Sequence, residues 1–308
     1  MSIFFNKSIL ILSLCLINLL ICQDANVRLN DISVEALGKS GKIRINKSIK
    51  RDNTTESNTI TLDFSSLKEL DVNGTEVGKS GETKHSFNNF AQMDFTISQS
   101  NVVYQNLTAL AIDLTATNIQ LNATRFSAKL FIFNQTGSIS NNGESASVEP
   151  GTIKLSIDIQ NWNFCKQNAL CPGINCCKRG NDEEVGNFLE FVMTVKGKES
   201  SKKKSEKIYS LGGSELIVFQ NVQVDGNWTT MPTGYPRENN KDEYTFRFPT
   251  FTQRLSYDPI IQYEKPASSS KIMIIVIVAI VLTVVIAAVL FVRRKTNTRN
   301  SETLINAK

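Results

Sequence analysis

Residues 152–159 read T-I-K-L-S-I-D-I, an unbroken alternation of polar and apolar side chains. A period of two places each set on one face of an extended strand, so this stretch predicts a β-strand with one buried face. The alternation recurs at residues 59–64 (T-I-T-L-D-F) and 93–97 (M-D-F-T-I). Apart from the strongly apolar segments near the two ends of the chain, no stretch keeps the 3.6-residue period of an amphipathic helix. The pattern therefore predicts an all-β fold.

Further strand candidates, rich in β-branched and aromatic residues, lie at 110–114, 119–121, 126–133, 188–195, 216–224 and 244–248. Turn signals separate them: Asn73-Gly74, Asn142-Gly143, Gly212-Gly213, Asp225-Gly226 and the proline-bounded segment 232–236. Many short strands joined by such turns are typical of a sandwich, so we expect a β-sandwich-like ectodomain. Residues 23–263 would form it as one domain, or as two halves, about 23–147 and 148–263.

A different pattern lies near the carboxyl end of the chain. Residues 272–292 are 21 uncharged, mostly branched residues, followed directly by Arg293-Arg294-Lys295. As a helix they would measure ~31 Å, close to the ~30 Å hydrocarbon thickness of a bilayer. We therefore predict one transmembrane α-helix at 272–292, preceded by a polar juxtamembrane spacer at 264–271.

The amino-terminal residues 1–22 have the composition of a secretory signal peptide, with Lys7, an apolar run and then Cys22. We expect cleavage near Cys22; an uncleaved anchor is the alternative. Three basic residues follow the 272–292 segment and only Lys271 precedes it, so the positive-inside rule places the tail, 293–308, in the cytosol. The chain would be a single-pass type I membrane protein, in the plasma membrane or an internal membrane. Its net charge of +5 is modest, and an exterior location excludes nucleic acid as a partner.

Four cysteines outside the signal segment cluster at Cys165, Cys171, Cys176 and Cys177. In an oxidising compartment an even, tight set predicts two disulfides. The adjacent Cys176 and Cys177 are badly placed to bond each other. The pairing is therefore Cys165 with Cys176 and Cys171 with Cys177, or Cys165 with Cys177 and Cys171 with Cys176. Zinc is the alternative, but the spacing lacks the paired C-x2-C motifs of such sites.

Seven N-x-S/T sequons support an exterior location and predict N-glycosylation. They lie at Asn46, Asn53, Asn73, Asn106, Asn122, Asn134 and Asn227. We expect several of these asparagines to carry glycans and to mark exposed positions.

The chain offers little for catalysis. Its single histidine, His85, lies in the polar stretch G-E-T-K-H-S-F-N-N, so we interpret it as a surface residue of a loop. One histidine excludes multi-histidine metal sites, and no G-x-S-x-G elbow is present. The segment 73–80 ends like a P-loop, but Asn73 stands where the first glycine is required. We predict no catalytic, cofactor-binding or metal-binding residue, and no cofactor.

Two other features are candidates for binding. The run at 198–207, K-E-S-S-K-K-K-S-E-K, could dock sulfated glycans or anionic headgroups, but a solvated hairpin is the favoured interpretation. Tyr104, Trp162, Trp228 and Tyr235 could line a sugar or peptide groove, although packing is the commoner role of such side chains.

The second half of the chain resembles a known family. It contains W-N-F-C at 162–165, M-P-T-G-Y-P at 231–236, F-P-T-F at 248–251 and Y-D-P at 257–259. Over 151–259 this set resembles the ectodomain of the skeletal aspartic acid-rich proteins of skeletal organic matrix. The resemblance implies an extracellular matrix module without known catalytic residues. Those proteins also carry long Asp-rich runs, which this chain lacks. The resemblance therefore implies a shared scaffold but does not imply mineral binding.

We therefore expect a membrane glycoprotein with a non-catalytic, β-rich ectodomain for cell-surface binding, adhesion or matrix contact. The extracellular partner would be a protein or a glycan. The alternatives are a glycan-acting ectoenzyme with a carboxylate pair that the sequence does not reveal, and a co-receptor subunit, since the tail is too short to signal alone.

Truncation of the chain before Lys271 should release it into the medium, because the signal peptide would remain while the membrane span would be lost. Immunoblots of cells and medium measure the distribution, with the full chain as the control. Retention of the truncated chain in the cells would contradict anchoring by residues 272–292.

Overall fold

The computed structural model describes residues 24–51, 54–77, 85–120, 123–165, 178–179, 182–183, 185–239 and 242–264. These residues form antiparallel sheets, so the all-β prediction is confirmed. Residues 1–263 group as one compact unit and residues 264–308 as another. Within the described ranges, no helix has the length and apolar character needed to cross a membrane. The predicted signal peptide (1–22), membrane helix (272–292) and tail (293–308) lie outside those ranges.

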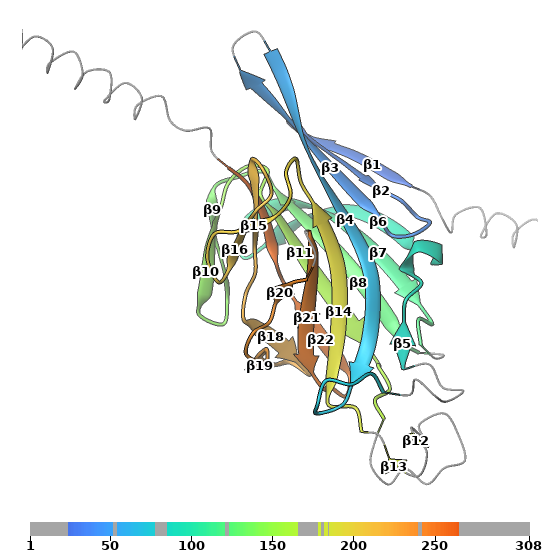
Figure 1. Ribbon diagram of the computed structural model, residues 1–308. Helices are drawn as coiled ribbons and strands as arrows, with labels where there is room; N and C mark the ends of the chain where they lie inside the picture. The colour runs from blue at the N-terminus through green and yellow to red at the C-terminus, as the bar shows by residue number, and fades with distance from the viewer. Residues whose placement is uncertain are drawn as a thin grey trace, which may run out of the picture. The chain divides into compact units, whose positions relative to one another are not determined.

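The first large sheet has eight strands, in the order β1-β2-β3-β4-β14-β21-β20, with β5 paired to β4. Its strands are β1 (Ala25–Leu29), β2 (Ile32–Ala36), β3 (Ile43–Arg51), β4 (Thr54–Leu70), β5 (Ser86–Phe87), β14 (Phe188–Lys196), β20 (Arg237–Glu238) and β21 (Glu243–Pro249). β3 and β4 form the long hairpin visible in Figure 1. β14 pairs with β4, so both halves of the chain contribute to this sheet.

The second large sheet has eleven strands and is built around β11, which pairs with β8 on one side and with β22 and β23 on the other. β7 and β6 continue the sheet beyond β8, and β15 to β19 complete it. Its strands are β6 (Thr96–Tyr104), β7 (Leu107–Thr117), β8 (Arg125–Phe133), β11 (Ile153–Gln160), β15 (Lys202–Lys203), β16 (Ile208–Ser210), β17 (Ser214–Ile217), β18 (Asn221–Val224), β19 (Asn227–Thr230), β22 (Arg254–Tyr257) and β23 (Ile260–Tyr263).

Three small elements lie outside the two large sheets. β9 (Gly137–Asn141) and β10 (Glu144–Val148) form one hairpin, β12 (Lys178–Arg179) pairs with β13 (Asp182–Glu183), and η1 (Phe90–Gln92) is a single 3-10 turn.

One hydrophobic core lies between the two large sheets, because apolar residues of both belong to a single buried cluster. The alternation in β11 buries its isoleucines and leucine on the core side, as predicted. Aromatic rings join the layers: Phe126 of β8 lies 5.0 Å from Phe64 of β4 and 4.8 Å from Phe90, measured between ring centroids. Burial of each such ring stabilises the fold by roughly 1.5–3 kcal/mol.

Tight turns set the register of several hairpins. Asn142-Gly143 connects β9 to β10, and Asp225-Gly226 connects β18 to β19; both residues of each turn have positive φ, as the favoured two-residue hairpin turns require. These two turn predictions are confirmed. Gln105-Asn106 joins β6 to β7 with the same pair of positive φ angles but without glycine, so this hairpin had no strong sequence signal.

Three predicted strand segments differ from the structure. Ile119 is buried but lies in the turn after β7. The predicted strand at 93–97 begins too early, since β6 starts at Thr96. Phe95 instead donates its N–H to the carbonyl of Gly38, in the loop between β2 and β3. The segment 216–224 is divided between β17 and β18.

Candidate functional site

The side chain of Glu69 faces the core because of an irregularity in β4. Phe64 pairs with Met193 of β14, yet the neighbouring Val192 pairs with Ser66, so β4 has one extra residue at this point. Such a β-bulge exchanges the faces of all residues that follow it. Beyond the bulge the odd-numbered residues of β4 face inward, and Glu69 is 0% exposed.

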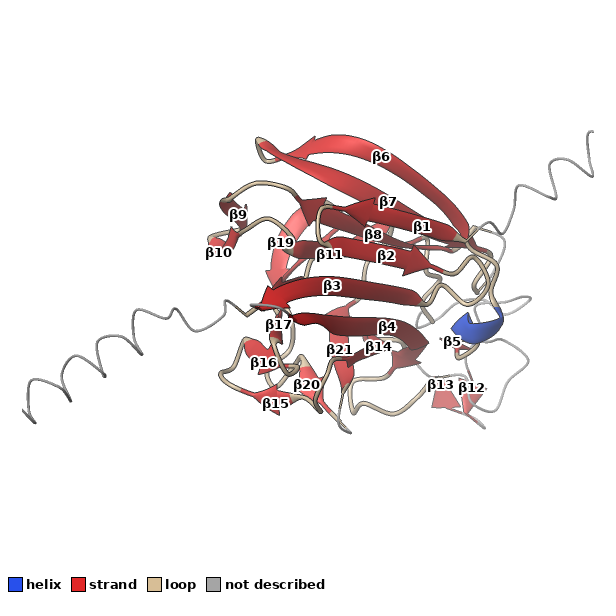
Figure 2. Ribbon diagram, turned by 90° about the horizontal axis from the view of Figure 1, so that it is seen from above, coloured by secondary structure: helices blue, strands red, loops and turns tan. Residues whose placement is uncertain are grey.

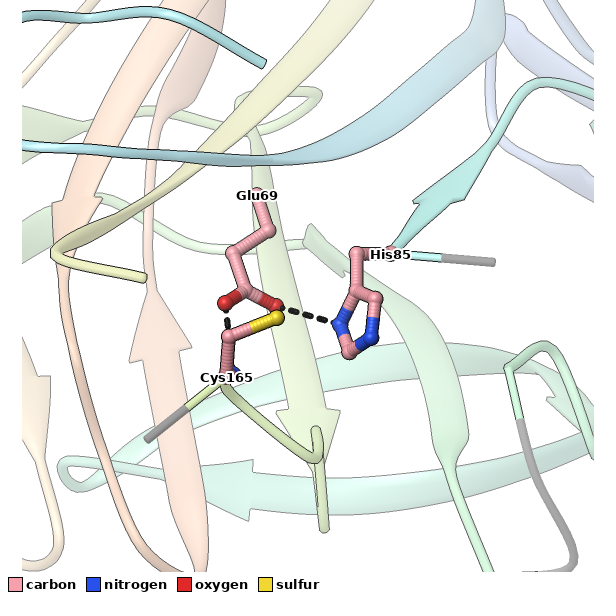
Figure 3. A group of neighbouring side chains, drawn as sticks. All are labelled: Glu69, His85 and Cys165. Carbon is pink, nitrogen blue, oxygen red and sulfur yellow. Dashed lines mark hydrogen bonds and ion pairs between the residues drawn. The ribbon is translucent and has the colours of Figure 1, made fainter. Parts of the chain in front are cut away.

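Three neighbouring residues hydrogen-bond the buried carboxylate, and Figure 3 shows two of them, His85 and Cys165. The backbone N–H of Cys165 donates to Oε1 at 2.6 Å. Nδ1 of His85 lies 2.9 Å from Oε2, and the indole N–H of Trp162 donates to the same oxygen at 3.4 Å. We call these four residues the Glu69 hub. A buried carboxylate needs such donors, because an unpaired charge inside a protein costs several kcal/mol.

Gly186 completes the enclosure of the hub. A Cβ atom at this position would lie 1.7 Å from Oε1 of Glu69, so only glycine fits there. Its N–H also donates to the carbonyl of Cys165 at 3.1 Å.

The interpretation of His85 as a surface residue is wrong, since this residue is 2% exposed. The cause lies in the pairing of β5 with β4, which brings the residue before β5 beside the inward-facing end of β4. The backbone N–H of Glu69 donates to the carbonyl of His85 at 2.9 Å, so the two residues are joined through both backbone and side chain.

The hub also has the composition of a metal site. Ligand atoms of Glu69, His85 and Cys165 lie within 4.8 Å of one another, and all three residues are buried. Cys165, however, is disulfide-bonded. A sulfur in a disulfide is not the thiolate that a metal ion binds. In this oxidised form the carboxylate and imidazole serve the hydrogen-bond network, and the hub is a structural element.

A pocket of about 390 Å³ lies next to the hub and shares two residues with it, Trp162 and Cys165. The described lining residues come from four separate segments, which meet at the same end of the two sheets. They are Trp162, Asn163, Phe164, Cys165, Val185, Gly186, Asp225, Thr250, Phe251 and Thr252. The lining therefore combines aromatic rings with hydroxyl and amide groups.

Asp225 is the carboxylate among these lining residues, and its oxygens are fully engaged. Oδ2 accepts the N–H and the hydroxyl of Thr252, and Oδ1 accepts the N–H groups of Gln253 and Arg254, at 2.7–2.9 Å. Burial alone would raise the pKa of Asp225, but these hydrogen bonds to the ionised form lower it to about 2. Asp225 thus joins the β18–β19 turn to the loop that precedes β22.

A family model described as acidic skeletal organic matrix protein matches residues 21–205 and 196–292, most of the chain. The chain belongs to this family. The resemblance of residues 151–259 is therefore confirmed, and the match also includes the first half, where the sequence showed no distinctive motif. No solved structure matches the chain.

Two of the motifs that carry the family resemblance meet at the pocket. W-N-F-C follows β11, and F-P-T-F spans the end of β21 and the loop after it. Phe164 of the first motif and Phe251 of the second pack edge to face, with ring centroids 5.3 Å apart. In this family member both motifs thus build one wall of the pocket.

The predicted disulfide framework lies mostly outside the described residues. Cys165 is 1% exposed and disulfide-bonded, whereas Cys171, Cys176 and Cys177 are not among the described residues. The two-disulfide arrangement and its pairing stay predictions.

Five of the seven predicted glycosylation sites lie in the described ranges. Asn73, Asn106, Asn134 and Asn227 are exposed, and Asn46 is half-buried and accepts a hydrogen bond from Thr59. Asn53 and Asn122 lie outside the described ranges. Their glycosylation stays a prediction.

The four candidate aromatic residues do not form one groove. Trp162 is in the hub, while Trp228 is 38% exposed on β19. Tyr235 is buried with the guanidinium of Arg247 4.5 Å from its ring centroid. Tyr104 instead lies against the ammonium of Lys154, 4.6 Å from its ring centroid.

The lysine-rich run at 198–207 includes β15 and the turn that leads to β16, and several of its lysines have acidic partners. Lys204 lies 2.8 Å from Glu215, and Lys207 lies 2.6 Å from Glu144. These carboxylates offset part of the positive charge, which disfavours the run as a site for polyanions.

Glu69→Gln should lower the free energy of unfolding by about 2–4 kcal/mol, because an amide nitrogen would replace an oxygen that accepts buried hydrogen bonds. Urea unfolding measures the change. Glu35→Gln is the control, since Glu35 forms a half-exposed ion pair with Arg44 and should change stability by under ~1 kcal/mol. Equal losses in both variants would contradict a special role of the hub.

Asp225→Asn should change the pH dependence of stability. The folded-state pKa of about 2 lies below the ordinary value of 3.8, so ionised Asp225 stabilises the fold above pH ~4. This contribution is lost as the pH falls from ~4 to ~2. The difference in Tm between wild type and Asp225→Asn should therefore shrink over that interval, as followed by circular dichroism. A difference that stays constant between pH 5 and pH 2 would refute this assignment.

Proposed function

We propose that this chain is a non-catalytic binding module displayed at the cell surface, and that its pocket takes a neutral sugar unit of an extracellular glycan. The proposal includes a β-sandwich-like ectodomain at 23–263 and a single membrane-spanning helix at 272–292. The family description, skeletal organic matrix protein, supports an extracellular setting.

The observation that carries the proposal is the state of the carboxylates at the pocket. Glycoside hydrolysis needs a pair of carboxyl groups that reach the substrate, one of them able to donate a proton. Asp225 has a pKa of about 2 and four hydrogen-bond donors around it, and Glu69 is fully buried within the hub. Both groups hold the pocket in shape, which supports binding rather than chemistry.

The lining favours a sugar as the ligand. Its volume of about 390 Å³ lies in the range of small-molecule sites, and aromatic walls with a few polar groups are typical of them. The nearly buried Trp162, Phe164 and Phe251 make up the apolar part of the lining, and the exposed Thr250 and Thr252 contribute polar groups. No basic residue is among the described lining residues, and the ionised Asp225 disfavours sulfated or acidic sugars.

Mineral binding is not part of the proposal, because the charge of the β-rich region is nearly balanced. Residues 24–264 contain 28 Asp and Glu against 26 Lys and Arg, and the longest acidic run is Asp182-Glu183-Glu184. Dense carboxylate arrays that could attract many calcium ions are therefore missing from the sequence.

The pocket also lies far from the point where the chain leaves the second sheet. At one end of β11, Gln160 pairs with Arg254 beside the pocket segments. At the other end Ile153 pairs with Ile261, two residues before β23 ends. The eight residues of β11 extend over about 24 Å. The pocket and Tyr263, the last residue of β23, therefore lie toward opposite ends of β11.

Thr250→Arg should reduce glycan binding at least tenfold, because a long charged side chain would fill the pocket. Thr250 is exposed in the loop between β21 and β22, so the fold should tolerate the change. Cells that display the full chain are tested on an array of neutral and sulfated glycans, with Ser147→Arg on the exposed face of β10 as the control.

Two results would overturn the proposal. Binding that Thr250→Arg leaves unchanged would remove the pocket as the site. Shortened glycans after incubation with purified wild-type protein would instead identify an ectoenzyme.

A further inference from the structure

The edge strands of the two large sheets differ in their protection against pairing with other strands. β15 is Lys202-Lys203 and β20 is Arg237-Glu238, both short and charged. β1 carries the exposed Arg28, and β19 begins at Asn227, a predicted glycosylation site. Short length and charged side chains are the usual means by which proteins keep sheet edges from associating.

β6 has none of these protections. Its nine residues, T-I-S-Q-S-N-V-V-Y, contain no charged residue, proline or glycine. It pairs with β7 over all nine positions without a bulge, and within the described chain it has no partner on its other side. Figure 2 shows β6 at the margin of its sheet, next to β7. A regular edge of this length is a template for another strand.

The side chains of β6 indicate which partner strand fits this edge. Val103 is 70% exposed, one of the few large apolar side chains that the described residues expose to solvent. Ile97 lies six positions away on the same face of the strand and packs partly against the main core. Ser100 is midway between Ile97 and Val103. Its neighbours Gln99 and Asn101 lie on the same face of the strand as Ile97 and Val103.

We propose that β6 pairs antiparallel with β6 of a second copy of this chain, about a twofold axis at Ser100. In this register Ile97 of each copy faces Val103 of the other copy. The exposed valine of each copy therefore gains an apolar neighbour. Gln99 faces Asn101 of the other copy, which places amide groups opposite each other. No like charges meet, and each copy offers the same surface, as a closed twofold dimer requires.

The antiparallel arrangement has a consequence for adhesion that rests on the surface anchor of the proposed function. β6 runs from the pocket end of the sheet toward the end where Tyr263 closes β23, as the pairings through β7, β8 and β11 establish. Twofold pairing therefore brings the pocket end of one copy beside the Tyr263 end of the other. The two chains leave the pair at opposite ends, which fits copies carried by two facing cell surfaces. The predicted glycosylation site Asn106 lies in the turn beyond Tyr104, outside the paired residues.

The test compares two double variants of the full chain purified in detergent, by analytical ultracentrifugation over a concentration series. Gln99→Lys with Asn101→Lys places like charges opposite each other at two points and should raise the dimer dissociation constant at least tenfold. Gln99→Lys with Asn101→Glu places opposite charges at the same points and should keep the wild-type constant or lower it. Ser138→Lys with Ser145→Lys adds the same charge on the exposed β9–β10 hairpin and should leave the constant unchanged.

A wild-type chain that stays monomeric at every concentration would overturn the proposal. Equal weakening by the Lys/Lys and Lys/Glu variants would also overturn it, because the register about Ser100 predicts opposite effects.

Cells that display the chain supply the second readout: wild-type and Lys/Glu cells should aggregate, and Lys/Lys cells should not. Dimers in detergent without aggregation of wild-type cells would refute the facing-surface arrangement. None of these variants touches the pocket, so glycan binding remains a separate measurement.

Discussion

The buried carboxylate of Glu69 is the interaction on which the pocket end of the fold depends. Its donors come from the segment before β5 and from the loop after β11, neither of which is held there by a long strand. Burial of a carboxyl group is costly unless hydrogen-bond partners surround it. The network therefore specifies where Trp162 and Cys165 lie, and with them one wall of the pocket.

Asp225 acts in the same way on the loop that contains Phe251. It accepts hydrogen bonds from successive backbone groups of the loop before β22, while Phe251 of that loop packs against Phe164. Two carboxylates, one buried and one at the rim, thus hold loops that the sheets alone would leave less constrained. The proposed sugar would therefore meet a pocket that needs little rearrangement, which reduces the entropic cost of binding.

The sequence was sufficient to predict β11 and part of β4 from strict alternation, and β8, β14 and β21 from their β-branched and aromatic residues. It also predicted the two hairpin turns that contain glycine. It did not predict the Glu69 hub. The bulge that turns Glu69 inward depends on pairing with β14, and β14 begins at Phe188, so no local pattern around residue 69 reveals it. His85 lies in a polar segment that resembles a loop, and its burial follows from the pairing of β5 with β4. For the pocket, the sequence singled out the motifs W-N-F-C and F-P-T-F but not their meeting, because the approach of two loops is a tertiary property.

The pairing of β4 with β14 also has a consequence for biosynthesis. Leu70 lies against Phe188, roughly 120 residues later, so the first sheet cannot close until most of the chain has been made. Until then β4 presents a long unpaired edge with apolar side chains, a species prone to aggregation. The growing chain should therefore depend on chaperones during synthesis, and its yield should be more sensitive to temperature than the stability of the finished fold would suggest.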